Sequence, residues 1–297
     1  MADRASLQKS RMMMVTAMAI FGTVALFVRN IPVASSEIAL YRAALAALLL
    51  GAFLLLTGQK IDFRAIRKEL PLLLISGMAM GINWILLFEA YRYTTVSVAT
   101  LSYYFAPVIV TVACPLLFKE KMGFKQWLCF GMSTLGIVLI TGVGDLSARN
   151  THLIGILFGL GAAVLYAAVV LLNKFIKGVA DIQRTFLQFV AAVLILLPYV
   201  LLTGGIDLGA VRAVGWVCLL VLGLVHTGLT YWMYFSALKE LPGQKAAILS
   251  YIDPLVAVVV SVAILGEPLT FWQAVGGILI LGFTLWNEIT PNVKSKQ

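Results

Sequence analysis

The sequence predicts an all-α, polytopic membrane protein in which ten transmembrane helices form two inverted five-helix repeats around a central cavity. Three observations lead to this prediction. The chain of 297 residues is 61% hydrophobic with a mean hydropathy of +0.99, and its 12% of charged residues is about half the usual share in soluble domains. Ten apolar stretches of membrane-crossing length fill the chain, and its second half repeats the first at an offset of 146–147 residues.

The apolar stretches are expected to be helices rather than strands of a membrane barrel. An unpaired backbone amide costs several kcal/mol in hydrocarbon, which leaves only these two structures. Barrel strands are about 10 residues long and alternate in polarity, whereas these stretches are about 20 residues long and continuously apolar. The expected spans are 12–29, 37–57, 70–91, 97–118, 125–142, 152–173, 183–203, 213–238, 244–265 and 271–288.

The internal repeat is clearest in 90–120, which aligns without a gap with 237–267. The alignment sets Tyr104 against Tyr251 and Pro107 against Pro254. Each half holds five spans, an odd number, so the second half enters the membrane from the opposite side and the repeats are inverted. The expected organisation is a tail over 1–11, a repeat over 12–142, a connecting loop over 143–151, a repeat over 152–288 and a tail over 289–297.

The net charge of +9 reflects membrane topology rather than nucleic-acid binding. If the amino terminus is cytoplasmic, seventeen lysines and arginines fall in cytoplasmic segments and four on the opposite side. Basic residues concentrate on the cytoplasmic side of membrane proteins. We therefore expect a multi-pass protein of the cytoplasmic (inner) membrane with both termini in the cytoplasm and no nucleic-acid partner, present in the lipid bilayer as a monomer or weak homodimer.

Asp253 is the most informative ionisable residue, because it lies close to the middle of the 244–265 span. At 1.5 Å per residue it lies about 13 Å from the cytoplasmic end of its helix, near half of the ~30 Å hydrocarbon core. A charge there costs ~2.5 kcal/mol or more, so the side chain is expected to face a cavity, hold a proton or bind a cation. The alternative is a protonated Asp253 that hydrogen-bonds to a neighbouring helix. Its equivalent in the first repeat is Ala106.

His226 is the second ionisable residue near mid-membrane and, with Asp253, a candidate for proton coupling. His226, Thr230 and Tyr234 follow at intervals of four and are expected to share one helix face that lines the cavity. The alternative is a neutral histidine that hydrogen-bonds between packed helices.

Pro107 and Pro254 are candidate hinges because they occupy equivalent mid-helix positions in the two halves. Proline lacks an amide proton, so it leaves a backbone carbonyl one turn earlier without its helical partner. A kink there supplies polar backbone atoms to a cavity and a bending point for gating. The alternative is an ordinary packing kink, which is common in membrane helices.

Aromatic side chains cluster on the third, fourth, eighth and ninth spans, where they suit a cation or a second ring through cation–π and stacking contacts. Polar atoms of Asn83 and Tyr166 are expected to help orient a ligand. The candidate substrate-binding residues are Asn83, Trp84, Tyr103, Tyr104, Tyr166, His226, Thr230, Tyr234, Tyr251 and Asp253.

Arg42 and Glu89 lie in the outer third of their spans and are candidates for an external gate. Arg42 is close enough to the membrane surface to reach it or to pair with a carboxylate. One alternative is an ion pair that fixes the external rim. Another is that Arg42 anchors a substrate carboxylate. Glu267, at the start of the last helix, is expected to have the structural role of an acidic residue at a helix start.

Several motifs make the chain resemble the EamA type of the drug/metabolite transporter superfamily. They are Trp84 followed by Ala90-Tyr91-Arg92-Tyr93-Thr94-Thr95-Val96, the Tyr-x-x-Pro segment at 104–107, Gly266-Glu267-Pro268-Leu269 and the glycine-rich last helix. The resemblance covers about residues 12–288. It implies an inner-membrane carrier, often an exporter, with a central cavity between its halves. Related proteins carry amino acids, nucleotide precursors, vitamins, choline and drugs.

The sequence and the resemblance together predict a secondary active or facilitative transporter of small metabolites that works by alternating access, most specifically an exporter of amino acids or related compounds. A carrier of a cationic solute, such as choline or a lipophilic cation, is the alternative. A membrane-embedded lipid-modifying enzyme is disfavoured, because the loops are short and mostly basic. No cofactor fingerprint, metal-ligand spacing or phosphate-binding loop is present, so we expect no cofactor and no ATP hydrolysis.

Overall fold

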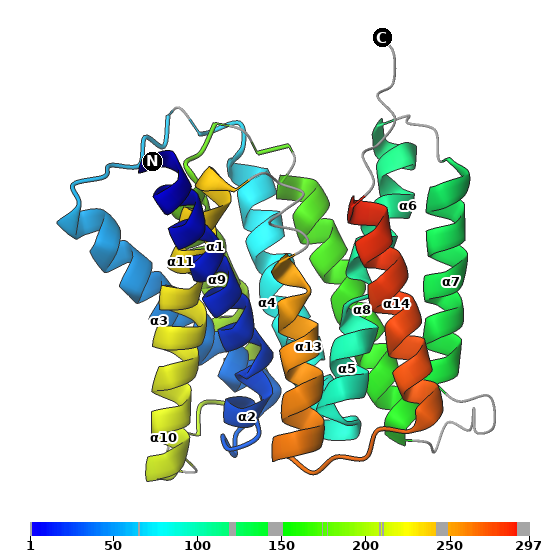
Figure 1. Cartoon of the computed structure of the whole chain (residues 1–297). Helices are drawn as coiled ribbons and strands as arrows, with labels where there is room; N and C mark the ends of the chain where they lie inside the picture. The colour runs from blue at the N-terminus through cyan, green and yellow to red at the C-terminus, as the bar shows by residue number, and fades with distance from the viewer. Residues whose placement is uncertain are drawn as a thin grey trace.

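The computed structural model describes residues 2–64, 66–118, 123–141, 151–173, 175–176, 178–207, 209, 211–241 and 249–289. Within these residues all regular structure is helical (Figure 1). The first half forms α1 (Ala2–Gly22), α2 (Val24–Val28), α3 (Ser35–Leu56), α4 (Leu70–Tyr93), α5 (Val96–Tyr103), α6 (Ala106–Phe118) and α7 (Phe124–Thr141). The second half forms α8 (Thr151–Asn173), α9 (Asp181–Thr203), α10 (Ala213–Leu220), η2 (Val221–Leu229), α11 (Thr230–Glu240), α13 (Ile252–Val259), η3 (Val260–Ile264) and α14 (Phe271–Ile289).

These helices confirm the predicted polytopic all-α fold. Six apolar helical segments are long enough to cross a membrane, and four shorter ones complete the pattern. The long segments are Leu7–Val28, Ser35–Leu56, Leu70–Tyr93, Thr151–Asn173, Ile182–Thr203 and Ala213–Tyr234, and the shorter ones are Val96–Val110, Phe124–Ile140, Ile252–Ile264 and Phe271–Asn287. Ala213–Tyr234 is one continuous crossing, in which the wider π-helical turns of η2 lie between α10 and α11.

The two central helices are interrupted at equivalent places. In the first half the helix breaks at Tyr104 and Phe105, between α5 and α6, and in the second half at Tyr251, just before α13. Each break lies two or three residues before its proline, Pro107 or Pro254, which cannot donate a helical hydrogen bond. The predicted interruption is therefore present in both halves, slightly earlier in the chain than the prolines themselves.

A third break separates α1 from α2 at Thr23, whose hydroxyl donates to the Ile20 carbonyl at 2.7 Å. The preceding Gly22 lies directly against the second half. A Cβ atom at this position would lie 2.6 Å from the Asp253 carbonyl oxygen and from the Val256 side chain. Only glycine allows α1 to approach α13 this closely.

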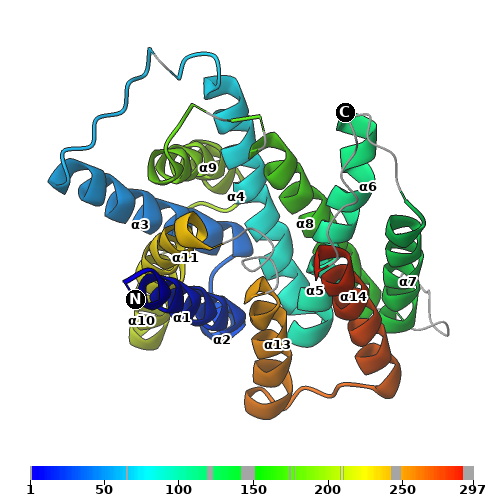
Figure 2. The ribbon, with the colours of Figure 1, turned by 45° about the horizontal axis from the view of Figure 1, so that its top comes forward.

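The closest packing occurs between the halves rather than within them. α4 packs against α8 and α9, α3 against α9, α7 against α14, and α1 against α11 and α13. Figure 2 shows α4 running through the middle of the bundle between α8 and α9. Such interdigitation makes any space at the centre a shared product of both halves.

Two faces of the bundle are used as references below. α1 begins and α14 ends at one face, which we call the terminal face (Figure 1). α3, α5, α8 and α14 begin at the opposite face, which we call the far face.

Candidate functional site

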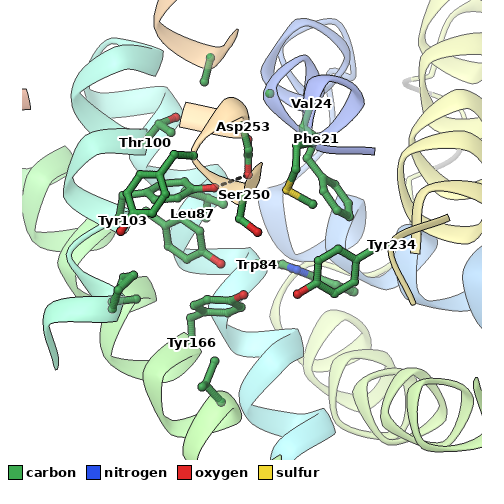
Figure 3. Close-up of a pocket in the computed structure, with 18 of the residues that line it drawn as sticks. Phe21, Val24, Trp84, Leu87, Thr100, Tyr103, Tyr166, Tyr234, Ser250 and Asp253 are labelled. Atoms are coloured by element: carbon green, nitrogen blue, oxygen red, sulfur yellow. Dashed lines mark hydrogen bonds between the residues drawn. The ribbon is translucent and has the colours of Figure 1, made fainter. Parts of the chain in front are cut away.

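A cavity of about 350 Å³ lies at the centre of the bundle (Figure 3). Helices α1 to α6 of the first half line it together with α8, α11 and α13 of the second half. The lining consists of aromatic and aliphatic side chains with a few polar groups. It includes Phe21, Arg42, Trp84, Tyr91, Thr100, Tyr103, Tyr104, Pro107, Tyr166, Tyr231, Tyr234, Ser250, Tyr251, Asp253 and Ala257.

Asp253 supplies the negative group of the cavity. It lies in the first turn of α13 and lines the cavity together with Ser250 and Ala257. The hydroxyl of Tyr104, from the other half, donates to Asp253 Oδ2 at 2.6 Å (Figure 3). Tyr104 lies at the break between α5 and α6, and Asp253 follows the equivalent break at Tyr251. The hydrogen bond therefore joins the two interrupted helices.

Arg42 supplies the positive group. Its side chain points from α3 into the bundle, where Nε donates to Thr227 Oγ1 at 2.7 Å. The guanidinium carbon lies 4.5 Å from the centroid of the Trp84 ring and 5.9 Å from that of Phe88. Among the described residues, neither Arg42 nor Asp253 forms an ion pair. The cavity therefore presents one basic and one acidic side chain, which interact electrostatically with each other without direct contact.

Packed aromatic rings form the surface between these two charges. Tyr103 contacts Tyr104 edge-on with ring centroids 5.9 Å apart, and Tyr166 with centroids 5.4 Å apart. Phe21 meets Tyr231 edge-on at 5.2 Å. Rings held in this way offer their faces and hydroxyls to a ligand with both apolar and polar parts.

The exposure of the lining residues differs between the two ends of the cavity. Lining residues towards the far face are buried, such as Tyr91 in the last turn of α4 and Thr100 in α5. Tyr166, in the half of α8 nearer the terminal face, is 39% exposed, and Val170 and Ser250 are half-buried. The described lining residues are therefore more exposed towards the terminal face than towards the far face.

Comparison with known proteins fits this architecture. The model of the EamA-like transporter family matches the chain twice, over residues 8–142 and 153–287. The chain belongs to the EamA-like transporter family. It is a multi-pass membrane transporter and not an enzyme.

Individual relatives of this EamA-like chain carry no substrate in their names. An uncharacterized transporter YxxF of Bacillus subtilis (strain 168) is 30% identical over 268 residues, covering 90% of this chain and 85% of the relative. An uncharacterized transporter of Archaeoglobus fulgidus is 29% identical over 273 residues, covering 91% and 93%. A solved crystal structure matches the fold with a TM-score of 0.63 at 15% identity, over 93% of this chain and 95% of the other.

Most of the predicted binding residues of this EamA-like transporter line the cavity. They are Trp84, Tyr103, Tyr104, Tyr166, Tyr234, Tyr251 and Asp253, together with the candidate hinge Pro107. Tyr91 and Phe21 also line it, although neither was among the predicted binding residues. Tyr91 follows Trp84 by seven residues, a spacing that places both on one helix face and could have identified it.

Asn83, Thr230 and His226 do not line the cavity, contrary to the prediction. Asn83 Nδ2 donates to the Ala162 carbonyl at 2.5 Å and joins α4 to α8. Thr230 Oγ1 donates to the Val225 carbonyl of its own helix at 2.7 Å. The expected common face with Tyr234 assumed α-helical spacing, whereas the π-helical turns of η2 change the direction of successive side chains.

His226 connects the halves instead of facing a ligand. Its Nε2 lies 2.9 Å from Thr23 Oγ1 at the α1–α2 break, and its ring packs 4.6 Å from the ring of Phe27. This is the alternative of a histidine that hydrogen-bonds between packed helices. Pro254 is likewise buried behind the cavity wall, whereas Pro107 lies in the wall.

Arg42 and Glu89, the candidates for an external gate, lie apart and have different partners. Glu89 pairs with Arg92 of the same helix at 3.3 Å, and the Arg92 side chain is largely exposed. Arg42 is buried in the cavity wall, because the Trp84 ring and the Thr227 hydroxyl satisfy its guanidinium there.

Proposed function

We propose that this transporter carries small zwitterionic metabolites, amino acids first among them, by alternating access through the central cavity. The observation that carries the proposal is the presence of Arg42 and Asp253 in one cavity without ion-pair partners among the described residues. A guanidinium forms paired hydrogen bonds with a carboxylate, and an aspartate binds an ammonium group. A ligand that carries both groups would neutralise both charges.

The size and lining of the cavity support a small ligand with an apolar part. Its volume of about 350 Å³ lies at the lower end of the range, roughly 300–1,000 Å³, that small-molecule sites occupy. The aromatic surface between the charges suits an amino-acid side chain. A solute with many charges would leave some of them unpaired against these rings.

Alternating access is supported by the position of the cavity between interdigitated halves that carry matching helix breaks. We propose that the cavity opens to the terminal face, where its lining is more exposed, and that this face is cytoplasmic, which the distribution of basic residues supports. A cavity open to the cytoplasm is in the state that loads a substrate for export. For proton coupling we propose Asp253 rather than His226, because only Asp253 faces the cavity.

A purely cationic solute is the second candidate, favoured by Asp253 among tyrosine rings. The fixed charge of Arg42 in the same cavity opposes it, because two cations would share one small apolar space.

Matched ligand triplets distinguish the two candidates. Thermal unfolding of the purified protein is measured with phenylalanine, with phenethylamine, which lacks the carboxylate, and with 3-phenylpropanoate, which lacks the amine. Corresponding triplets for leucine and methionine follow. The proposal expects the zwitterion of at least one triplet to raise the melting temperature more than either analogue. An amine that stabilises as strongly as its amino acid would instead establish the cation carrier.

A further inference from the structure

An ion pair joins the two halves at the far face. Arg29, directly after α2, pairs with Glu267 in the connection between η3 and α14. The Arg29 side chain is about one-third exposed, and the Glu267 side chain is nearly buried. Partial burial strengthens such a pair, because less water screens it.

Further hydrogen bonds extend this pair to α4, α5 and η3. Glu267 Oε2 accepts from the Val96 amide at 2.7 Å and from Ser261 Oγ at 2.5 Å. Arg29 Nη2 donates to the carbonyls of Tyr91, at 3.2 Å, and Thr94, at 3.4 Å. Glu267 thus occupies the amide-rich start of α5 in the opposite half, rather than the start of its own helix as the sequence predicted.

The Gly-Glu-Pro motif explains how Glu267 reaches the first half. Gly266 has a φ of +65°, a left-handed conformation that favours glycine and turns the chain sharply after η3. Pro268 on the other side restricts the backbone of Glu267 to extended conformations. The motif therefore places the Glu267 carboxylate against the start of α5 and against Arg29.

This cluster lies next to the end of the cavity at which the lining residues are buried. Tyr91, whose carbonyl accepts from Arg29, also lines the cavity. Val24 in the cavity wall is five residues from Arg29 in the chain, and Thr100 is one helical turn from Val96. The cluster therefore adjoins the lining of the cavity on the side of the far face.

We propose that Arg29 and Glu267, with Val96 and Ser261, are the gate of the far face: their contacts close it in this state and must separate for the cavity to open there. The inference rests on the alternating access of the proposed function. In this proposal, Glu267 of the Gly-Glu-Pro motif holds the second half against the first.

The test measures how fast a reagent on the far side reaches the closed end of the cavity. Thr100→Cys is introduced after Cys114, Cys129 and Cys218 are replaced by serine. The protein is placed in sealed vesicles of each orientation, and a membrane-impermeant thiol reagent is added outside. We expect Glu267→Gln to raise the far-side labelling rate of this cysteine about tenfold or more, because a charge-assisted latch is lost.

Glu89→Gln is the matched control, because it removes an ion pair at the same face that lies within one helix. It should leave the labelling rate unchanged. The exchange of charges, Arg29→Glu with Glu267→Arg, should restore slow labelling, at least in part. Arg29→Gln provides a second single variant if Glu267→Gln does not fold, as judged by size-exclusion chromatography and thermal unfolding.

Folded Glu267→Gln or Arg29→Gln protein that labels no faster than the parent would overturn the gate. Labelling needs no substrate, so this result would leave the proposed zwitterion specificity intact. Conversely, ligand triplets that favour an amine would reject the substrate class without affecting the gate.

Discussion

The two halves of the molecule repeat one scaffold but differ in the charges it carries. Tyr104 and Tyr251 mark the same helix break in each half. Asp253, however, brings a carboxyl group to the cavity, whereas its sequence equivalent Ala106 lines the same cavity without a charge. The scaffold is thus symmetric where the halves must move against each other, and asymmetric where a ligand must be recognised.

The positions equivalent to Arg42 show the same difference. In the first half Arg42 faces the cavity, with Trp84 and Thr227 as partners. In the second half the equivalent Gln188 donates to Ser76 Oγ at 2.7 Å and to Asn173 Oδ1 at 2.8 Å, and serves helix packing. One half therefore supplies the cation of the site and the other its anion, so a bound zwitterion would bridge the two.

Asp253→Asn should have the largest effect on this division of charge. The amide keeps the shape of the side chain but removes the negative charge and the proton-binding group. We expect affinity for the zwitterion to fall about 100-fold, the upper range for a lost charged contact, and pH dependence of flux to disappear. Flux into proteoliposomes at several pH values measures both. Unchanged pH dependence would reject Asp253 as the coupling group.

Arg42→Gln, which installs the residue found at the equivalent position of the second half, should have the next largest effect. Affinity for the amino acid should fall roughly 10- to 100-fold, because its carboxylate loses a charge-assisted partner. Affinity for the matched amine should be equal or higher, since a repulsive charge is gone. Equal losses for amino acid and amine would argue that Arg42 acts on protein structure and not on the carboxylate.

Tyr104→Phe should have a moderate effect, because it removes only the hydrogen bond to Asp253 across the two halves. The loss of about 1 kcal/mol corresponds to roughly fivefold weaker binding. Tyr199→Phe is a suitable control, since Tyr199 lies half exposed on the surface of α9. Titration calorimetry with the ligand from the screen measures both variants. Similar affinities for the two would show that the Tyr104 hydroxyl does not support the carboxylate.

His226→Gln should have the smallest effect on transport, because the ring contacts Thr23 and Phe27 and not the cavity. We expect the melting temperature to fall by about 2–4 °C while ligand affinity stays unchanged. Thermal unfolding and calorimetry on the same preparation separate the two quantities. A change in the pH dependence of flux would return His226 to the list of coupling groups.

The sequence predicts the helical scaffold well, because the patterns that reveal it extend over long segments of the chain. Span length and repeat offset each draw on about 20 or more residues, so local exceptions do not disturb them. The inward position of Asp253 was also predictable, since its depth in the span places a charge where it needs a polar cavity.

The errors have local and tertiary causes. Thr230 and His226 lie in or beside π-helical turns, which no spacing in the sequence announces. The position of Arg42 in its span predicts a side chain at the rim of the membrane, whereas its guanidinium packs on the Trp84 ring of α4 inside the bundle. Glu267 was assigned to its own helix, but its partners belong to segments about 170 and 240 residues earlier in the chain.

The most direct test of the central claim is an experimental structure of the transporter with the best-stabilising amino acid bound. We predict that the ligand lies in the central cavity, with its carboxylate bound by the Arg42 guanidinium and its ammonium group bound by Asp253. A ligand held by Asp253 alone, with Arg42 turned away, or a ligand outside the cavity, would contradict it.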